Sequence, residues 1–286
     1  MSEAFTLIDN EQSLSQTCMQ FSQSTWLAID TEFERVSTYY PELCLVQVSN
    51  GINTAVIDPI AINNLEPLFE LLYQQSITKV LHSARQDLEI FFNIKGIVPT
   101  PLFDTQIVAP VLGYAKGIGY GNLVKEVLGI ELDKGHARTN WKQRPLTEKQ
   151  LRYAADDAIY LGKAYEIFIK KLIEVETLSS LDEQHVVLEK PETYQPDPEK
   201  MWKKIYAAKR LHGKPLAVVK QLAAWRELTA RSRNRPRKWI IPDHALVDIA
   251  MRLPENKSEL LQIDKVGEKT VSRHGDALLE IIEHTQ

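Results

Sequence analysis

The chain contains few cysteines and no long apolar run. Only Cys18 and Cys44 occur among 286 residues. Their spacing fits neither a zinc site nor a redox pair, so two reduced thiols are expected. No stretch of about 18 apolar residues is present, which argues against a membrane-spanning helix and a membrane partner. Residues 1–6 lack the basic and apolar parts of a secretory signal, so a cytoplasmic location is expected.

Two common enzyme signatures are also missing. The sequence has no Gly-x-Ser-x-Gly, which argues against a serine hydrolase with a nucleophile elbow. It has no Gly-x-x-x-x-Gly-Lys-[Ser/Thr], which argues against a P-loop nucleotidase. With 44% hydrophobic residues, the chain can form packed cores in one large and one small domain. Nothing in the pattern indicates an obligate protein partner.

Charge is distributed unevenly along the chain. Residues 201–286 hold 17 Lys and Arg against 10 Asp and Glu, a net charge of +7. Because the whole chain has a net charge of −4, the first 200 residues carry −11. An acidic region that holds a polyanion needs positive charge from metal ions or from a basic neighbour, and the C-terminal region could attract nucleic acid at longer range.

Two acids follow the first apolar strand pattern. Residues 26–29 are apolar and lead into Asp30, Thr31 and Glu32. Side chains at i and i+2 of a strand point to the same face, so Asp30 and Glu32 would project side by side. Strand patterns at 43–48 and 53–59 follow after short turns, which predicts an antiparallel meander. Two solvated acids at a strand end would explain this segment equally well.

A third acid lies at the start of a helix pattern. Residues 79–83 predict a strand, and Ser83 with Gln86 resembles a capping box. Asp87 would then lie in the first helical turn, where an acid is favourable for the helix dipole. That local role alone would account for Asp87.

A tyrosine and a fourth acid share one face of a later helix. Thr147 and Gln150 form another capping-box pattern before a long amphipathic helix. Tyr153 and Asp157 are four residues apart and therefore lie on the same face. A cluster of carboxylates raises the pKa of each member, and divalent cations remove that repulsion. Together the three segments indicate metal-dependent hydrolysis of a phosphodiester.

The order and context of these residues resemble the DEDD family of 3′–5′ exonucleases, in the branch with a tyrosine in its last motif. Within that family the chain is similar to the ribonuclease D enzymes over residues 5–175. Further matching stretches are Ala28–Phe33, Thr38–Pro41, Phe103–Ile107, Gly119–Tyr120, Leu132–Lys134, Trp141 and Arg144–Leu146.

The resemblance implies a fold and a chemistry. The expected fold is α/β, a ribonuclease H-like mixed sheet flanked by helices, followed by a small all-α helical bundle. The implied cofactors are two divalent cations, Mg²⁺ or Mn²⁺. Asp30 would contact both ions, Glu32 and Asp157 one of them, and Asp87 the other, while Tyr153 would orient the attacking water. The implied activity is a 3′–5′ exoribonuclease that releases nucleoside 5′-monophosphates and trims tRNA and other structured RNA 3′ ends.

The C-terminal region resembles the helicase and RNase D C-terminal (HRDC) domain, a nucleic-acid-binding module in its family. The matching residues are Gln221–Arg226, Arg235–Arg237, Trp239–Ile240, Asp243 and the pattern Leu260-x-x-Ile263-x-x-Val266-Gly267. The chain is therefore divided into an exonuclease domain (1–190), a linker and connecting helix (191–212) and one HRDC-like domain (213–286). Typical bacterial relatives are expected to carry a second such domain.

Several residues are candidates for contacting RNA. Phe33, Tyr39 and Tyr40 follow the first motif and could stack on terminal bases. His82 precedes Asp87, and the basic run contains Arg233, Arg235 and Arg237. Core packing or solvated charge explains each of these residues equally well, and Trp225 and Trp239 are expected in the core. The alternative functions are a DNA 3′–5′ exonuclease of the proofreading type and a non-catalytic RNA-binding adaptor.

Overall fold

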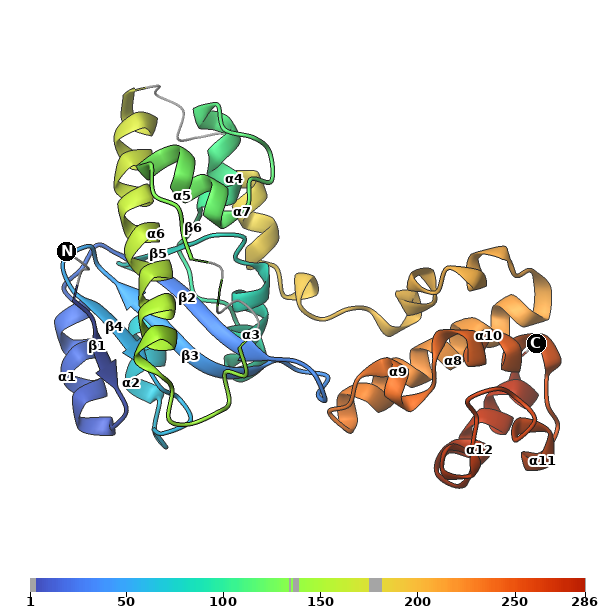
Figure 1. Cartoon of the computed structure of the whole chain (residues 1–286). Coiled ribbons are helices and arrows are strands. Elements are labelled where there is room, and N and C mark those ends of the chain that lie inside the picture. Colours follow the sequence, from blue (N-terminus) through green and yellow to red (C-terminus); the bar gives the residue numbers. More distant parts are fainter. Residues whose placement is uncertain (1–3, 134, 136–138, 175–181, 286) are drawn as a thin grey trace. The chain divides into compact units, whose positions relative to one another are not determined.

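The chain folds into two compact units. The computed structural model describes residues 4–133, 135, 139–174 and 182–285 (Figure 1). The first unit contains Met1–Glu34 and Pro41–Tyr194, and the second contains Arg35–Tyr40 and Gln195–Gln286. In the described ranges, no helix is both long enough and apolar enough to cross a membrane.

A six-stranded mixed sheet forms the centre of the first unit. Its order is β1-β4-β3-β2-β5-β6, in which β2, β3 and β4 form an antiparallel meander and the other pairs are parallel. The strands are β1 (Thr6–Ile8), β2 (Trp26–Glu34), β3 (Glu42–Ser49), β4 (Thr54–Ile57), β5 (Thr78–Leu81) and β6 (Leu102–Asp104). The α/β fold class and the meander are confirmed, whereas the short edge strands β1 and β6 were not predicted.

Helices cover both faces of this sheet. On one face, α1 (Glu11–Phe21), α2 (Glu66–Leu72) and α3 (Arg85–Lys95) pack against the odd-numbered residues Leu27 and Ile29 of β2. On the other face, α6 (Glu148–Glu174) runs across the central strands (Figure 1). The remaining elements of this unit are α4 (Thr105–Val108), η1 (Ala109–Leu112), α5 (Tyr120–Leu128), α7 (Asp182–Glu189) and η3 (Pro191–Thr193).

Helix α6 lies close to β2 because Gly162 has no side chain. A Cβ built on Gly162 would lie 3.1 Å from the Trp26 ring. The beginning of α6 is fixed by the predicted capping box, since Gln150 N donates to Thr147 Oγ1 and Thr147 N donates to Gln150 Oε1. The capping box at the start of α6 and the close approach to β2 at Gly162 together fix the rotation of the helix. This rotation places Tyr153 and Asp157.

The turn before α3 differs from the prediction. Ser83 has a positive φ of 57° and does not cap the helix, whose N-cap residue is Ala84. Instead, the carboxylate of Asp104 accepts hydrogen bonds from Ser83 N at 3.0 Å and Ala84 N at 2.8 Å. The capping group therefore comes from the neighbouring strand β6, which a local sequence pattern does not reveal.

The second unit is mostly helical. Its elements are η4 (Pro198–Lys204), η5 (Ala207–Arg210), α8 (Gly213–Ser232), α9 (Arg237–Ile240), α10 (Asp243–Arg252), α11 (Lys257–Leu260) and α12 (Glu268–His284). The connecting helix expected before residue 212 is replaced by the two 3₁₀ segments η4 and η5. Met201 of η4, Ala208 of η5 and Ile205 between them pack into the core of the bundle.

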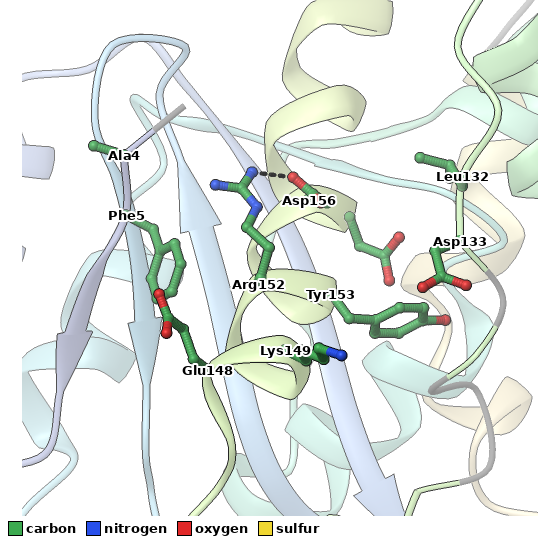
Figure 2. A pocket seen from close by; sticks show the side chains of 10 residues that line it. Ala4, Phe5, Leu132, Asp133, Glu148, Lys149, Arg152, Tyr153 and Asp156 are labelled. Atoms are coloured by element: carbon green, nitrogen blue, oxygen red, sulfur yellow. Dashed lines mark hydrogen bonds and ion pairs between the residues drawn. The ribbon is translucent and has the colours of Figure 1, made fainter. Parts of the chain in front are cut away.

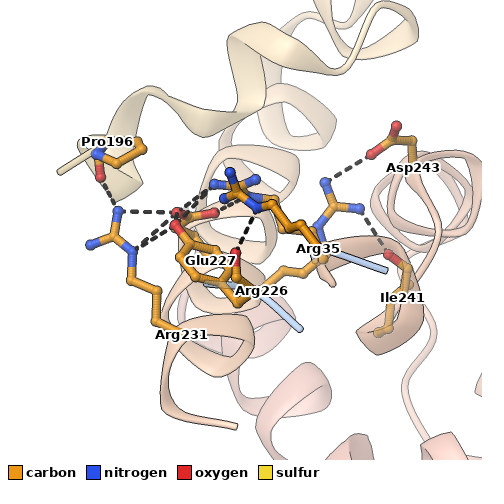
Figure 3. Close-up of polar contacts among 9 residues, drawn as sticks. Arg35, Pro196, Arg226, Glu227, Arg231, Ile241 and Asp243 are labelled. Carbon is orange, nitrogen blue, oxygen red and sulfur yellow. Dashed lines mark hydrogen bonds and ion pairs between the residues drawn. The ribbon is translucent and has the colours of Figure 1, made fainter. Parts of the chain in front are cut away.

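A buried glutamate organises polar contacts within this unit (Figure 3). The Glu227 side chain is fully buried and accepts hydrogen bonds from Tyr39, Arg231 and Arg237. Asn234 Oδ1 accepts hydrogen bonds from the backbone N–H groups of Tyr39 and Tyr40 at 3.0 and 3.1 Å. The segment Arg35–Tyr40, although it lies between β2 and β3 in the sequence, therefore belongs to the second unit.

Candidate active site

Three of the predicted acids meet between β2 and α6. Asp30 and Glu32 lie on the face of β2 that α6 covers, as their spacing predicts. Asp157 lies on α6, and one oxygen of each carboxylate lies within 4.8 Å of the other two. The antiparallel pairing of β2 with β3 is regular through Glu32 and shifts after it, so both acids precede the irregularity.

Asp87 reaches the same region from the other side of the strand. It lies in the first turn of α3, as predicted, and its Oδ1 accepts a hydrogen bond from the Thr31 hydroxyl. The Thr31 side chain points to the face of β2 opposite to Asp30 and Glu32, and it is buried there. Thr31 thus links the acid-bearing strand to α3, a role that only the alternation of β2 could have indicated.

Burial and mutual repulsion disfavour the charged forms of these carboxylates. Burial, together with Asp157, Asp87 and Glu32, holds the pKa of Asp30 well above its usual range. Burial, together with Asp157 and Asp87, raises the pKa of Glu32 to about 9. Burial raises the pKa of Asp157 to about 7, with a contribution from Asp156, and that of Asp87 to about 6. Four acids that repel one another inside a protein require a compensating positive charge.

The donor set suits a hard divalent cation. Asp30, Glu32 and Asp157 supply only oxygen ligands, which Mg²⁺ and Mn²⁺ prefer. Their oxygens are close enough to converge on one ion, and Asp87 stands near enough to Asp30 and Glu32 to raise the pKa of each. The residues therefore fit the metal-dependent chemistry that the sequence predicts.

A cavity opens onto these acids. Its volume is about 320 Å³, and its lining includes Asp30, Glu32 and Asp157 together with Tyr153 and His82. The remaining lining residues are Thr31, Tyr120, Gly121, Leu132, Asp133 and Leu161. An adjoining pocket of about 880 Å³ shares Leu132, Asp133, Tyr153 and Asp157 with it. The acids therefore line a cavity that adjoins a larger pocket beside α6.

Tyr153 stands at the boundary between these two spaces. Figure 2 shows its ring extending from α6 toward Asp133, while Arg152 turns back to an ion pair with Asp156. Burial and the negative charges of Asp157, Glu32 and Asp30 raise the pKa of Tyr153, so its hydroxyl keeps its proton at neutral pH. Tyr153 can therefore donate a hydrogen bond next to the acid cluster.

Sequence reasoning did not assign a role to Tyr120. Its hydroxyl donates to the backbone carbonyl of Asp157 at 2.5 Å, and its ring packs against His82 at 5.4 Å between centroids. His82 Nδ1 lies 2.9 Å from Thr105 Oγ1, and burial lowers the pKa of His82. The stretch Gly119–Tyr120 belongs to the family resemblance, which is the signal in the sequence that points to this residue.

The predicted RNA-contacting residues fall into three groups. His82 lines the cavity, and Phe33 and Tyr40 are half-buried near the end of β2 and in the following segment. Arg233 and Arg235 are exposed. The prediction for Tyr39 does not agree with the structure, because its side chain is only 5% exposed and the Arg237 guanidinium lies over its ring. Arg237 itself binds Glu227, so both side chains are already engaged within the second unit.

Comparison with known proteins agrees with this geometry. Residues 5–173 match the family model described as 3′–5′ exonuclease, and residues 216–282 match the HRDC domain. The fold and the acid cluster therefore define a 3′–5′ exonuclease with an HRDC domain. The chain is 42% identical to ribonuclease D of Pseudomonas paraeruginosa over 96% of its own length and 73% of the relative's. It is 40% identical to ribonuclease D of Zymomonas mobilis over 98% of its own length and 72% of the relative's.

A solved structure supports the same assignment. The crystal structure of Escherichia coli RNase D, described as an exoribonuclease involved in structured RNA processing, matches with a TM-score of 0.88 and 34% identity. That match covers 98% of this chain and 75% of the E. coli chain. The chain belongs to the ribonuclease D family and is a 3′–5′ exoribonuclease.

The raised pKa values predict an unusual pH dependence of stability without metal. Unfolded Asp and Glu ionise near pH 4, whereas folded Asp157 and Glu32 ionise near 7 and 9. Between these limits the folded state binds more protons, so the free energy of unfolding in EDTA should fall as pH rises from about 4 to 9. A one-unit shift in one group is worth about 1.4 kcal/mol.

Urea unfolding at pH 5 and pH 8 measures this effect. Saturating Mg²⁺ should remove most of the decline, because the cation supplies the missing positive charge. The variant Asp157→Asn, which lacks one of the repelling charges, should show a shallower decline in EDTA. An identical decline in the wild-type protein and in Asp157→Asn would contradict the assignment of the effect to this cluster.

Proposed function

We propose that this exoribonuclease trims the 3′ ends of tRNA precursors and other structured RNAs and releases nucleoside 5′-monophosphates one at a time. The observation that carries the proposal is the convergence of Asp30, Glu32 and Asp157 beside a cavity that Tyr153 also lines. The basic C-terminal region, with a net charge of +7 over residues 201–286, favours a polyanion as substrate.

Four residues are proposed to hold two divalent cations, Mg²⁺ or Mn²⁺. They are Asp30, Glu32, Asp87 and Asp157, whose clustering and raised pKa values favour cation binding. Bound cations would lower the pKa of a water molecule and stabilise the negative charge that develops on the phosphate. The protein would fix the carboxylates through the rigid strand β2, the Thr31–Asp87 hydrogen bond and the Tyr120 contact to the Asp157 carbonyl.

Tyr153 is proposed to orient the attacking water by hydrogen bonding. Replacing it with phenylalanine keeps the ring that packs near Trp141 and removes only the hydroxyl. We expect Tyr153→Phe to lower kcat by about 10²–10³-fold, the usual cost of losing one positioned hydrogen-bond donor, with little change in RNA affinity. Single-turnover rates and equilibrium RNA binding separate the two effects. A large loss of affinity with an unchanged rate would make Tyr153 a substrate-stacking residue instead.

The exposed basic segment after α8 is proposed to contact the RNA backbone. Arg233 and Arg235 are exposed, and Trp239, expected in the core, is 62% exposed and offers a face for base stacking. The double variant Arg233→Gln/Arg235→Gln should bind RNA more weakly. The slope of the logarithm of its RNA-binding constant against the logarithm of salt concentration should be shallower by about 1.4. This is the value for two lost contacts to a single-stranded backbone.

A matched variant controls for nonspecific loss of charge. Arg252 is exposed at the end of α10, outside this segment. The variant Arg252→Gln should leave the salt dependence close to that of the wild-type protein. Equal effects of the two variants would mean that the RNA is held by diffuse electrostatic attraction and not by a defined contact surface.

The experiment that tests the proposed function is a time course on two substrates. A tRNA precursor with a 3′ extension and a single-stranded DNA of the same sequence would each be incubated with Mg²⁺, Mn²⁺ or EDTA. Stepwise shortening of the RNA that requires metal, with 5′-monophosphates identified by mass spectrometry, is the expected result. Faster digestion of the DNA would favour the proofreading-type alternative, and binding without cleavage under every condition would favour the adaptor.

A further inference from the structure

One buried amide of the first unit lacks hydrogen-bond partners. Gln47 on β3 has no exposed surface, and neither its Nε2 nor its Oε1 has a partner within the protein. Among the residues that the structure describes, the only other buried side-chain atom of this kind is His82 Nε2. An unsatisfied buried polar group costs about 1–3 kcal/mol, so an amide with two such atoms calls for an explanation.

The position of Gln47 supplies that explanation. The register of the antiparallel pair places Gln47 directly opposite Asp30, so both side chains leave the sheet on the same face. Directly opposed residues have Cβ atoms about 4.5–5.5 Å apart, which is within reach of a glutamine amide. Above them lies α6, which contributes the small buried residues Ala154, Ala155 and Ala158. The amide is therefore enclosed beside the carboxylate that stands at the centre of the acid cluster.

The chemistry of the pair is complementary. A glutamine Nε2 is a donor of two hydrogen bonds, and an ionised carboxylate is a strong acceptor. A hydrogen bond to an ionised acceptor is shorter and about twice as strong as one between neutral groups. Asp30, directly opposite Gln47 on the same face, is the carboxylate placed to accept this bond. An Asp30 carboxylate turned to hold a cation would give the amide this partner.

We infer that Gln47 is a positioning residue that orients the Asp30 carboxylate for divalent cation binding. The inference rests on the proposed role of Asp30 as a metal ligand. Gln47 does not touch the substrate, and its effect passes through Asp30. Groups that orient metal-binding side chains typically contribute 10–100-fold to metal affinity or activity.

The variant Gln47→Met tests this role because it keeps the length of the side chain and removes both polar atoms. A residue that only packs would lose little, since exchanging an unsatisfied amide for an apolar group of similar shape is neutral or stabilising. We expect the free energy of unfolding in EDTA to be unchanged or higher. We expect Mn²⁺ affinity, measured by isothermal titration calorimetry, to fall at least about 10-fold, with a lower kcat and an unchanged RNA affinity in EDTA.

Leu45→Met is the matched control. Leu45 lies on the same strand and the same face, directly opposite Glu32, but it carries no polar group. Its volume-conserving replacement should leave Mn²⁺ affinity at the wild-type value. Gln47→Leu provides a second apolar variant in case Gln47→Met does not fold.

Wild-type Mn²⁺ affinity in a folded Gln47→Met or Gln47→Leu protein would overturn the inference. This outcome is distinct from failure of the proposed function, because the wild-type protein would still bind Mn²⁺ and shorten RNA. If the wild-type protein itself bound no divalent cation, the metal assignment of Asp30 would fail, and the inference on Gln47 would fail with it.

Discussion

Asp30→Asn should abolish 3′ shortening of RNA while making the metal-free protein more stable. Asp30 is the residue on which burial and the charges of Asp157, Asp87 and Glu32 all act in the same direction. Asparagine has nearly the same shape but no charge, so it removes the repulsion together with a carboxylate that a cation needs. We expect kcat to fall at least about 10³-fold, the upper end of the cost of removing one group that stabilises developing charge.

The opposite signs of the two effects make this prediction specific. Urea unfolding in EDTA at pH 8 should give a higher midpoint for Asp30→Asn than for the wild-type protein, whereas a mutation that damages the fold lowers both stability and activity. Glu70→Gln removes an exposed acid on α2 and should change neither quantity. Substantial residual turnover in pure Asp30→Asn would show that the cluster does not depend on this carboxylate.

Glu227→Ala should destabilise the second unit by about 3–5 kcal/mol, the usual cost of removing one partner from a buried ion pair. The Glu227 side chain has no exposed surface and neutralises both Arg231 and Arg237. Its removal would leave two guanidinium groups and the Tyr39 hydroxyl without their common acceptor. For a unit of roughly 100 residues, this loss lowers Tm by more than about 10 °C.

Differential scanning calorimetry measures this loss directly. Glu280→Gln, which changes an exposed glutamate on α12 of the same unit, should leave Tm within about 2 °C of the wild-type value. Tyr39→Phe should lower stability by about 1 kcal/mol, because it removes one hydrogen bond and keeps the ring. Equal stabilities of Glu227→Ala and the wild-type protein would mean that solvent replaces the lost contacts at no cost.

The parts of the site that depend on local periodicity were predictable from the sequence. Strand alternation placed Asp30 and Glu32 on one face, and helical spacing did the same for Tyr153 and Asp157. The Thr147–Gln150 cap was also recognised, because both of its partners lie within one turn. Grouping these segments around one cavity required the family resemblance, since no local rule brings a strand and a helix more than 100 residues later together.

The predictions that failed concern residues whose environment is decided by distant parts of the chain. Ser83 resembled a helix cap, but the group that binds its N–H is Asp104, 21 residues away. Tyr39 resembled a base-stacking residue, but its partners lie almost 200 residues later in the chain. Trp239 was expected in the core, yet the buried residue of the four-residue helix α9 is its neighbour Ile240, and Trp239 is 62% exposed. In each case a long-range contact, or its absence, decided the outcome.

The interleaving of the two units has a consequence for how such chains can be recombined. The second unit includes the segment Arg35–Tyr40, which is encoded far upstream of the rest of it. A deletion after residue 194 would strip Tyr39 of Glu227 and expose its ring, favouring aggregation of the fragment. Exchange of C-terminal modules between related genes would therefore yield a well-folded hybrid only when this hexapeptide is transferred together with α8. The second unit therefore depends on a short segment that lies, in the sequence, between two strands of the exonuclease domain.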